Sequence, residues 1–88
     1  MYVHIGQDFI VPTKSILCII DMDTATWSKH TRNLIQRLTK EGRVVELFDD
    51  LPRAGVLCGG TLGEHLYLTG LSSATLQKRA VQGLAAEG

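Results

Sequence analysis

The sequence predicts an α+β fold, in which a small, mostly antiparallel and bent β-sheet is packed by one central helix, and a second helix ends the chain. Three observations predict it. Apolar runs of strand length precede and follow a stretch of helical periodicity, the connections between these runs are too short for parallel crossovers, and the last stretch is helical again. Residues 1–88 are expected to form a single domain, close to the size at which one core becomes marginal.

The first part of the chain is predicted to hold three strands. Residues 2–5 and 9–11 favour strands, and the Gly-Gln-Asp of residues 6–8 is typical of a turn between them. Pro12 then bends the chain or marks an edge. Residues 15–20 are apolar almost throughout and do not alternate with polar residues, which predicts a fully buried strand.

The central helix is predicted to begin after Asp23 as its N-cap and to run to Glu41, where Gly42 supplies a left-handed stop. Met22 and Trp27 fall at the positions of a hydrophobic staple across that start. The core-facing stripe recurs at helical spacing, and it consists of Trp27, Leu34, Ile35 and Leu38.

The second half of the chain is predicted to add a strand, a hairpin and the last helix. Residues 43–47 favour a strand, and residues 54–58 and 65–69 are the arms of a hairpin joined by a glycine-rich loop. Ser72 or Ser73 caps the last helix. Its predicted apolar face consists of Leu76, Ala80, Val81 and Leu84. Because one helix covers only one face of the sheet, the other face is expected to be polar or to be buried by another subunit.

Composition bears on location and partners. Nine basic and nine acidic residues cancel, so any DNA binding must depend on where the charges lie. The apolar stretch at residues 16–20 is far shorter than the ~20 residues that span a bilayer. With ordered structure expected from the initiator methionine, we predict a cytoplasmic protein without a membrane partner. Cys18 and Cys58 lie in apolar runs and are expected to be buried, reduced thiols.

Charge clusters on the central helix. Lys29, Arg32 and Lys40 recur with Gln36 at helical spacing on one face. Such a stripe can lie along a phosphate backbone, where each cation displaces a condensed counterion. The alternative is a solvated helix face whose cations favour solubility and complement the helix dipole. The spacing alone leaves both interpretations open.

No residue pattern predicts catalysis. Asp21 and Asp23 are paired carboxylates, but no histidine or second acidic cluster stands near them, so helix capping explains them better. The three histidines and two cysteines lack metal-ligand spacing, and phosphate-binding glycine motifs are absent. We therefore expect no catalytic residue, no metal, no cofactor and no small-molecule substrate, and the protein is not expected to be an enzyme.

Three segments, taken in order, are similar to one known family. They are residues 4–6 (His-Ile-Gly) followed by 10–14 (Ile-Val-Pro-Thr-Lys), the strand 16–20 running into a helix with Ser28-Lys29 near its start and Glu41-Gly42 at its end, and residues 67–69 followed by 71–80. The chain resembles the small bacterial extracellular-matrix regulators of the RemA and RemB type, and the RemB branch most closely. The likeness covers nearly the whole chain.

The resemblance implies a DNA-binding transcriptional regulator of biofilm-matrix genes that assembles into a ring, with double-stranded DNA wrapped around it. It implies phosphate contacts at Lys14, where the RemA branch has an arginine, at Lys29 in the basic start of the helix, and at Arg53 in a loop where that branch has adjacent arginines. Together with Arg32 of the basic stripe, these are the predicted DNA-binding residues. The predicted partners are duplex DNA, read by its backbone shape, and further copies of the chain.

The loop before Arg53 leaves a second function open. Asp49 and Asp50 stand near the place of the family's arginine pair, and carboxylates that face phosphates repel them. The alternative is a small oligomeric protein–protein interaction module, an adaptor without DNA binding.

Overall fold

The computed structural model describes residues 1–23 and 28–87, with side chains as far as Val81. In chain order the elements are β1 (Tyr2–Gly6), β2 (Phe9–Pro12), the short 3-10 helix η1 (Thr13–Ser15), β3 (Ile16–Asp21), α1 (Lys29–Lys40), β4 (Val44–Leu47), β5 (Ala54–Cys58), β6 (His65–Thr69) and α2 (Ser73–Glu87). The predicted α+β class, with a central and a C-terminal helix, is confirmed.

The main sheet has the strand order β3-β5-β6-β4. β5 runs antiparallel to both of its neighbours, and β5 and β6 form the predicted hairpin. β4 runs parallel to β6, so the sheet is mostly but not wholly antiparallel. β1 and β2 form a separate antiparallel hairpin, whose turn uses positive φ at Gly6 and Gln7.

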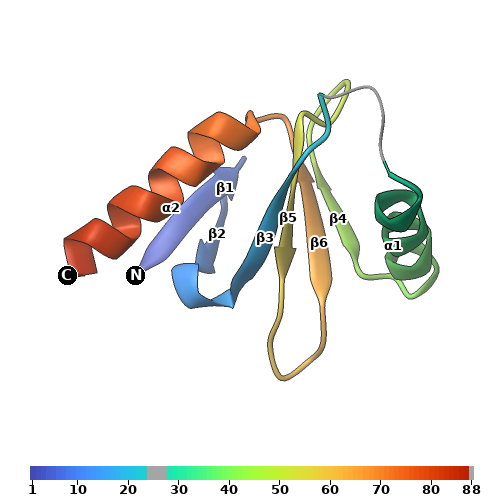
Figure 1. The fold of residues 1–88 in the computed structure, drawn as a ribbon, viewed down its shortest axis with the longest axis horizontal. Coiled ribbons are helices and arrows are strands. Elements are labelled where there is room, and N and C mark those ends of the chain that lie inside the picture. Colours follow the sequence, from blue (N-terminus) through green and yellow to red (C-terminus); the bar gives the residue numbers. More distant parts are fainter. Residues whose placement is uncertain (24–27, 88) are drawn as a thin grey trace.

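The main sheet is covered on both faces (Figure 1). On one face α1 buries a cluster of Met22, Leu38, Leu57, Leu66 and Leu68. On the other face β1, β2 and α2 enclose a second cluster, which includes Val3, Ile5, Val11, Leu47, Val56, Cys58 and Leu76. The expectation of a second face that is polar or covered by another subunit is therefore wrong, because the N-terminal hairpin and α2 cover it. All five residues of β5 are buried as a result.

The start of α1 differs from the prediction. Ser28 is the N-cap, and its hydroxyl oxygen accepts a hydrogen bond from the Thr31 backbone N–H at 3.1 Å. Asp23 is not the cap, because the helix begins only at Lys29; the Asp23 N–H instead donates to Asp21 Oδ1 at 2.9 Å in a turn at the end of β3. The predicted staple and the first position of the apolar stripe involve Trp27, which lies outside the described residues. At the other end Gly42 has φ +71° and stops the helix as predicted.

The C-terminal helix begins as predicted and packs differently. The Ser72 hydroxyl oxygen accepts a hydrogen bond from the Thr75 N–H at 3.2 Å, so Ser72 is the capping serine. Leu76 is buried against the sheet, but Val81 is 64% exposed and does not belong to the buried face. Arg79 ties the helix to β1, because its Nη1 donates to the His4 carbonyl oxygen at 3.0 Å.

The third strand is not buried as predicted. β3 is at the edge of the main sheet, and Leu17 on it is 57% exposed. A β-bulge between Ile16 and Cys18 shifts the register against β5 and turns Leu17 outward. An uninterrupted apolar run identifies a strand, but it does not say whether a neighbouring strand stands on both sides of it.

The two cysteines are free thiols, as predicted, but only Cys58 is buried. Cys18 is exposed because β3 is an edge strand. Cys18 stands opposite Leu57, which packs toward α1, whereas Cys58 packs toward the N-terminal hairpin. The two thiols therefore belong to opposite faces of the sheet.

Candidate nucleic-acid interface

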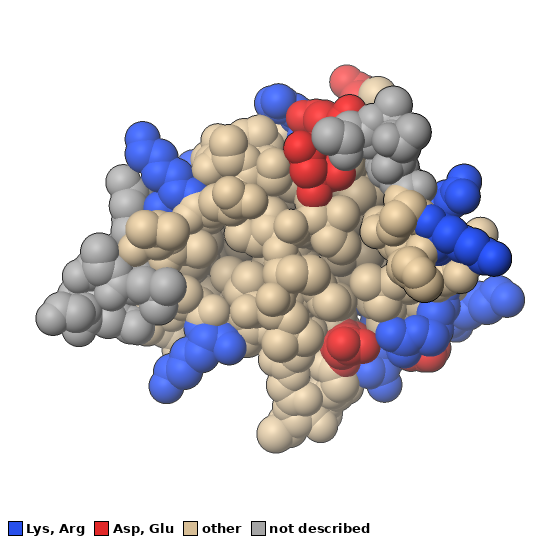
Figure 2. Space-filling view, viewed as in Figure 1, with Lys and Arg blue, Asp and Glu red and all other residues tan. Residues whose placement is uncertain are grey.

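The polar face of α1 presents cations that no acidic side chain neutralises in the described part of the chain. Leu38 is buried under the helix, and Leu34 and Ile35 pack beside it. The opposite face exposes the side chains of Lys29, Arg32, Asn33, Gln36 and Lys40. Within residues 1–23 and 28–81, no acid forms an ion pair with Lys29, Arg32 or Lys40. Figure 2 shows lysines and arginines gathered over this helix, at the right of the view.

Arg37 near the end of α1 and Arg43 between α1 and β4 have a structural role. Arg37 Nη2 lies 3.2 Å from Glu64 Oε1, which ties the helix to the β5–β6 hairpin. Arg43 Nε lies 3.5 Å from Glu41 Oε1, and the Arg43 guanidinium lies against Gly63, where an added Cβ would collide with it. Arg37 and Arg43 both have acidic partners. We therefore define the basic face of α1 as Lys29, Arg32 and Lys40.

The start of α1 places a cation at the positive end of the helix dipole. Lys29 is the first helical residue, and the first turn holds no acidic residue. A cation there disfavours the helix by about 0.3–1 kcal/mol, whereas an acid would favour it. The N-terminus of a helix also attracts anions through its backbone N–H groups. The charges of this turn therefore suit an anionic partner better than they suit the stability of the helix.

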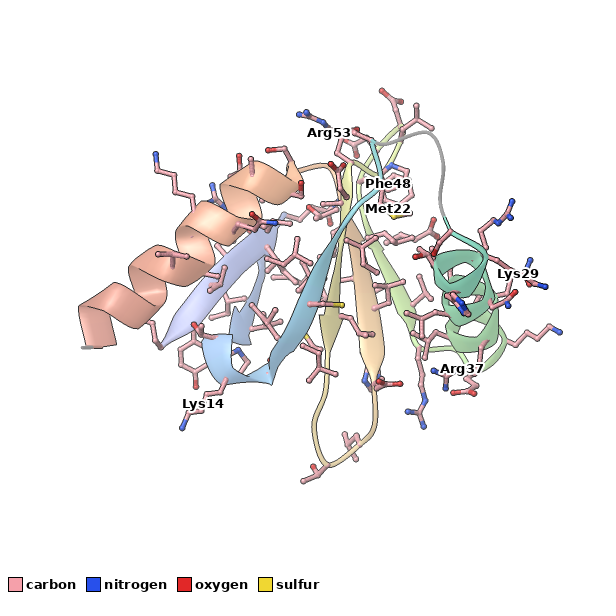
Figure 3. The ribbon with its side chains drawn as sticks, viewed as in Figure 1. Lys14, Met22, Lys29, Arg37, Phe48 and Arg53 are labelled. Atoms are coloured by element: carbon pink, nitrogen blue, oxygen red, sulfur yellow. The ribbon has the colours of Figure 1, made fainter. Side chains whose placement is uncertain are left out.

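The four predicted contact residues lie on three parts of the surface (Figure 3). Lys29 and Arg32 share α1, as predicted. Lys14 is exposed on η1, on the other side of the main sheet. Arg53 stands before β5, and its Nε lies 3.2 Å from Asp23 Oδ2. A single chain therefore brings together two of the four cations, and Arg53 has an acidic partner within the chain.

Sequence reasoning missed two features of this region. Asn33 lines a shallow hollow of about 380 Å³ with Gln36 and Lys40. Its place in the sequence, next to Arg32 and about one turn from Gln36, could have assigned Asn33 to the basic face of the helix. The pairing of Arg37 with Glu64 joins residues 27 positions apart, which no local pattern indicates.

A group of acidic residues lies away from α1, whereas Glu41 and Glu64 lie by the end of α1, where both pair with Arg37. Asp23 and Asp50 line an open hollow of about 550 Å³ together with Met22, Leu51, Pro52 and Arg53. In Figure 2 acidic side chains cluster at the top of the view, apart from the basic face of α1. This separation gives a neutral chain one surface that suits phosphates and another that repels them.

The structure indicates little acid–base or metal chemistry in the described parts of the chain. Burial raises the pKa of the Cys58 and Cys18 thiols and of the Tyr67 phenol, with a smaller effect of Glu64 on Cys18. Raised values keep these groups neutral, so the thiols are poor nucleophiles near neutral pH. Across residues 1–23 and 28–87, no three His, Cys, Asp or Glu side chains cluster as metal ligands would. The helices described there are too short or too polar to cross a membrane.

Comparison with known proteins identifies the family. The family model for RemA-like proteins, described as extracellular matrix regulatory protein A-like, matches residues 2–80. The chain belongs to this family. One relative, the extracellular matrix regulatory protein B of Bacillus subtilis (strain 168), is 32% identical over 80 residues, which cover 91% of this chain and 90% of that protein. The sequence-based resemblance to this family is confirmed.

Proposed function

We propose that this RemA-like protein is an architectural DNA-binding regulator of extracellular-matrix genes that contacts the duplex backbone as a homo-oligomer. The observation that carries the proposal is the basic face of α1, where Lys29, Arg32 and Lys40 stand exposed without an acidic partner in the described residues. The family supports a role in matrix-gene regulation.

The spacing of the basic face suits a phosphate backbone. Lys29, Arg32 and Gln36 follow one another by about one turn, or ~5 Å along the helix, and Lys40 follows after another turn. Lysine and arginine bind phosphate by charge and by hydrogen bonds that carry no base sequence. The proposed mode is therefore tolerant of DNA sequence, with the exposed amides of Asn33 and Gln36 as further donors.

Assembly is part of the proposal because one neutral protomer offers few contacts. Repetition of the basic face around a ring multiplies simultaneous contacts with one wrapped duplex. Lys14 and Arg53 are the further proposed contacts, and repeated protomers would let one duplex reach them as well. Arg53 would then exchange Asp23 for a phosphate. The proposed function needs no cofactor and no catalytic activity.

The proposal predicts the salt dependence of DNA binding. We expect the intact protein to bind a labelled duplex of several helical turns with an affinity that falls steeply as salt rises, as measured by fluorescence anisotropy. Lys29→Ala and Arg32→Ala are each expected to weaken binding on unrelated duplexes alike. Each is also expected to reduce the salt slope by about one unit, because each removes one cation that neutralises a phosphate.

Lys78→Ala is the matched control, because it removes the same charge from α2, away from α1. The control is expected to leave both affinity and slope nearly unchanged. Equal losses of affinity in Lys29→Ala and Lys78→Ala would show that net charge, rather than the basic face of α1, governs binding. The absence of binding by the intact protein at low salt would contradict the DNA proposal itself.

The open hollow lined by Asp23 and Asp50 favours a second candidate function, a protein–protein interaction module. Asp23 and Asp50 border it, and Leu51 beside them is 78% exposed, a combination of charge and apolar surface that suits a basic protein segment. Asp50→Asn with Leu51→Ser should disrupt a complex of this kind and leave DNA binding intact. A stable hetero-complex with these properties, alongside an absence of DNA binding, would select this function.

A further inference from the structure

The outermost ridge of α1 has uncharged amides in its middle and a lysine at each end. Because successive helical residues are rotated by about 100°, Lys29, Asn33, Gln36 and Lys40 lie within a strip of about 60°, opposite the buried Leu38. All four side chains of the ridge are exposed. Figure 1 shows α1 at one end of the molecule, with no other described element beyond it. The ridge is therefore accessible to a partner that offers a groove.

The two amides of the ridge are available for hydrogen bonds to a partner. Within residues 1–23 and 28–81, neither the Asn33 nor the Gln36 side chain forms a hydrogen bond with another residue. Both line the shallow hollow of about 380 Å³ on this face. Glu41 also lines the hollow, and its Oε2 lies 3.9 Å from Arg37 Nη1, so its charge is offset by a cation. The hollow therefore presents amide donors and acceptors without a repulsive charge.

The dimensions of α1 suit the major groove of B-form DNA. This groove is about 12 Å wide and admits a helix, whose diameter with side chains is about 10–12 Å, whereas the minor groove is only about 6 Å wide. Residues 29 and 40 are about 16 Å apart along the helix axis. Each of the two lysines can therefore reach a phosphate on one side of the groove while the amides between them face the base edges.

We propose that Asn33 and Gln36 read adenine in the major groove, so that a preference for A·T pairs is added to the backbone contacts of the lysines. An Asn or Gln side chain pairs with adenine through two hydrogen bonds, because its N–H donates to N7 and its carbonyl oxygen accepts from the N6 amino group. Guanine is read by arginine, but Arg37, next to Gln36, lies 3.2 Å from Glu64. The inference rests on the proposed DNA binding and adds base readout to it.

Modified bases test this readout on the intact protein. Fluorescence anisotropy would compare three labelled duplexes of equal length. The first is rich in A·T pairs in mixed order, without A-tracts, whose narrow minor groove would add an effect of shape. The second carries 7-deaza-adenine, which lacks the N7 acceptor. The third carries inosine–cytosine pairs, which keep the minor groove of A·T and show the major groove of G·C. The first is expected to bind on the order of tenfold more tightly than either of the others.

Removal of the amides should abolish the preference and leave the salt dependence unchanged. Asn33→Ala with Gln36→Ala is expected to bind the three duplexes equally, with the parental salt slope, because neither amide carries a charge. This variant is expected to fold, since both side chains are exposed and alanine favours a helix. Lys29→Ala should show the opposite pattern, a smaller slope with an unchanged preference. Gln77→Ala, which removes an exposed amide from α2, is the matched control and should change neither.

The possible failures are distinguishable. Salt-dependent binding with equal affinities for the adenine and 7-deaza-adenine duplexes would overturn the readout and leave backbone contact by α1 standing. Equal affinities for the A·T and inosine duplexes would place any preference in the minor groove and would also overturn it. So would a double variant that keeps the preference. The absence of binding at low salt would overturn the proposed function, and this inference with it.

Discussion

Gly6 illustrates how one position in this small core depends on the absence of a side chain. It has φ +140°, and an added Cβ would lie 2.6 Å from Oγ1 of Thr69. Thr69 is fully buried, and its Oγ1 already accepts a hydrogen bond from the Leu71 N–H at 3.1 Å. The turn between β1 and β2 is therefore closed against β6 by a glycine.

Gly6→Ala is expected to lower the free energy of unfolding by about 1–3 kcal/mol, because the new Cβ meets Thr69 in a backbone conformation that L residues avoid. Gly60→Ala is the matched control, since nothing lies within 4 Å of its added Cβ. Urea denaturation of both variants measures the difference. Equal stabilities would show that the β1–β2 turn rearranges without cost.

At the scale of the element, α1 combines a buried apolar side with a basic side whose charges act on the helix in opposite ways. Lys29 stands in the first turn and Lys40 in the last. A cation disfavours the helix at its N-terminus and favours it at its C-terminus. The two lysines should therefore affect stability differently while they contribute alike to an interface with phosphate.

Lys29→Glu is expected to raise the free energy of unfolding by about 0.3–1 kcal/mol, because an acid replaces a cation at the positive end of the dipole. Lys40→Glu should lower it by a similar amount. Both changes are expected to weaken DNA binding. Thermal denaturation and anisotropy on the same samples check the pattern. A loss of stability in Lys29→Glu would contradict a functional origin for the basic start of α1.

At the scale of the whole molecule, the fold partly buries three groups that ionise in alkali. Burial raises the pKa of Cys18, Cys58 and Tyr67. In the unfolded chain the pKa of a thiol is about 8.5 and that of a phenol is about 10. Above these values the unfolded chain loses protons that the native state keeps, so stability present at lower pH is lost as pH rises toward the raised values.

The free energy of unfolding is therefore expected to be level from neutral pH to about 8 and to decrease above it. Urea denaturation from pH 7 to 10.5 measures this. Cys58→Ala should be less stable throughout, because it leaves a small cavity, but its stability should fall less with pH, because one buried thiol is gone. An alkaline decrease as steep as that of the parent chain would show that Cys58 ionises equally in both states.

Local signals were sufficient for most of the elements. The β5–β6 hairpin, the left-handed stop at Gly42 and the cap at Ser72 follow from neighbouring residues, and the structure has each of them. The start of α1 was predicted too early because both Asp23 and Ser28 can cap a helix. The structure decides between them, because the Ser28 hydroxyl accepts the Thr31 N–H, whereas Asp23 Oδ2 lies 3.2 Å from Arg53 Nε.

By itself the sequence determined the α+β class and the cations on one side of α1, because periodicity and turn chemistry are local properties of the chain. It also determined the family, through the resemblance of three segments to known members. Only the tertiary structure decided which face of the sheet each element covers and that β3 lies at an edge. It also decided that Arg53 forms an ion pair with Asp23, whereas Lys29 and Arg32 form none with a described acid. These depend on strand order and on contacts between residues far apart in the chain. Periodicity within one segment does not encode them.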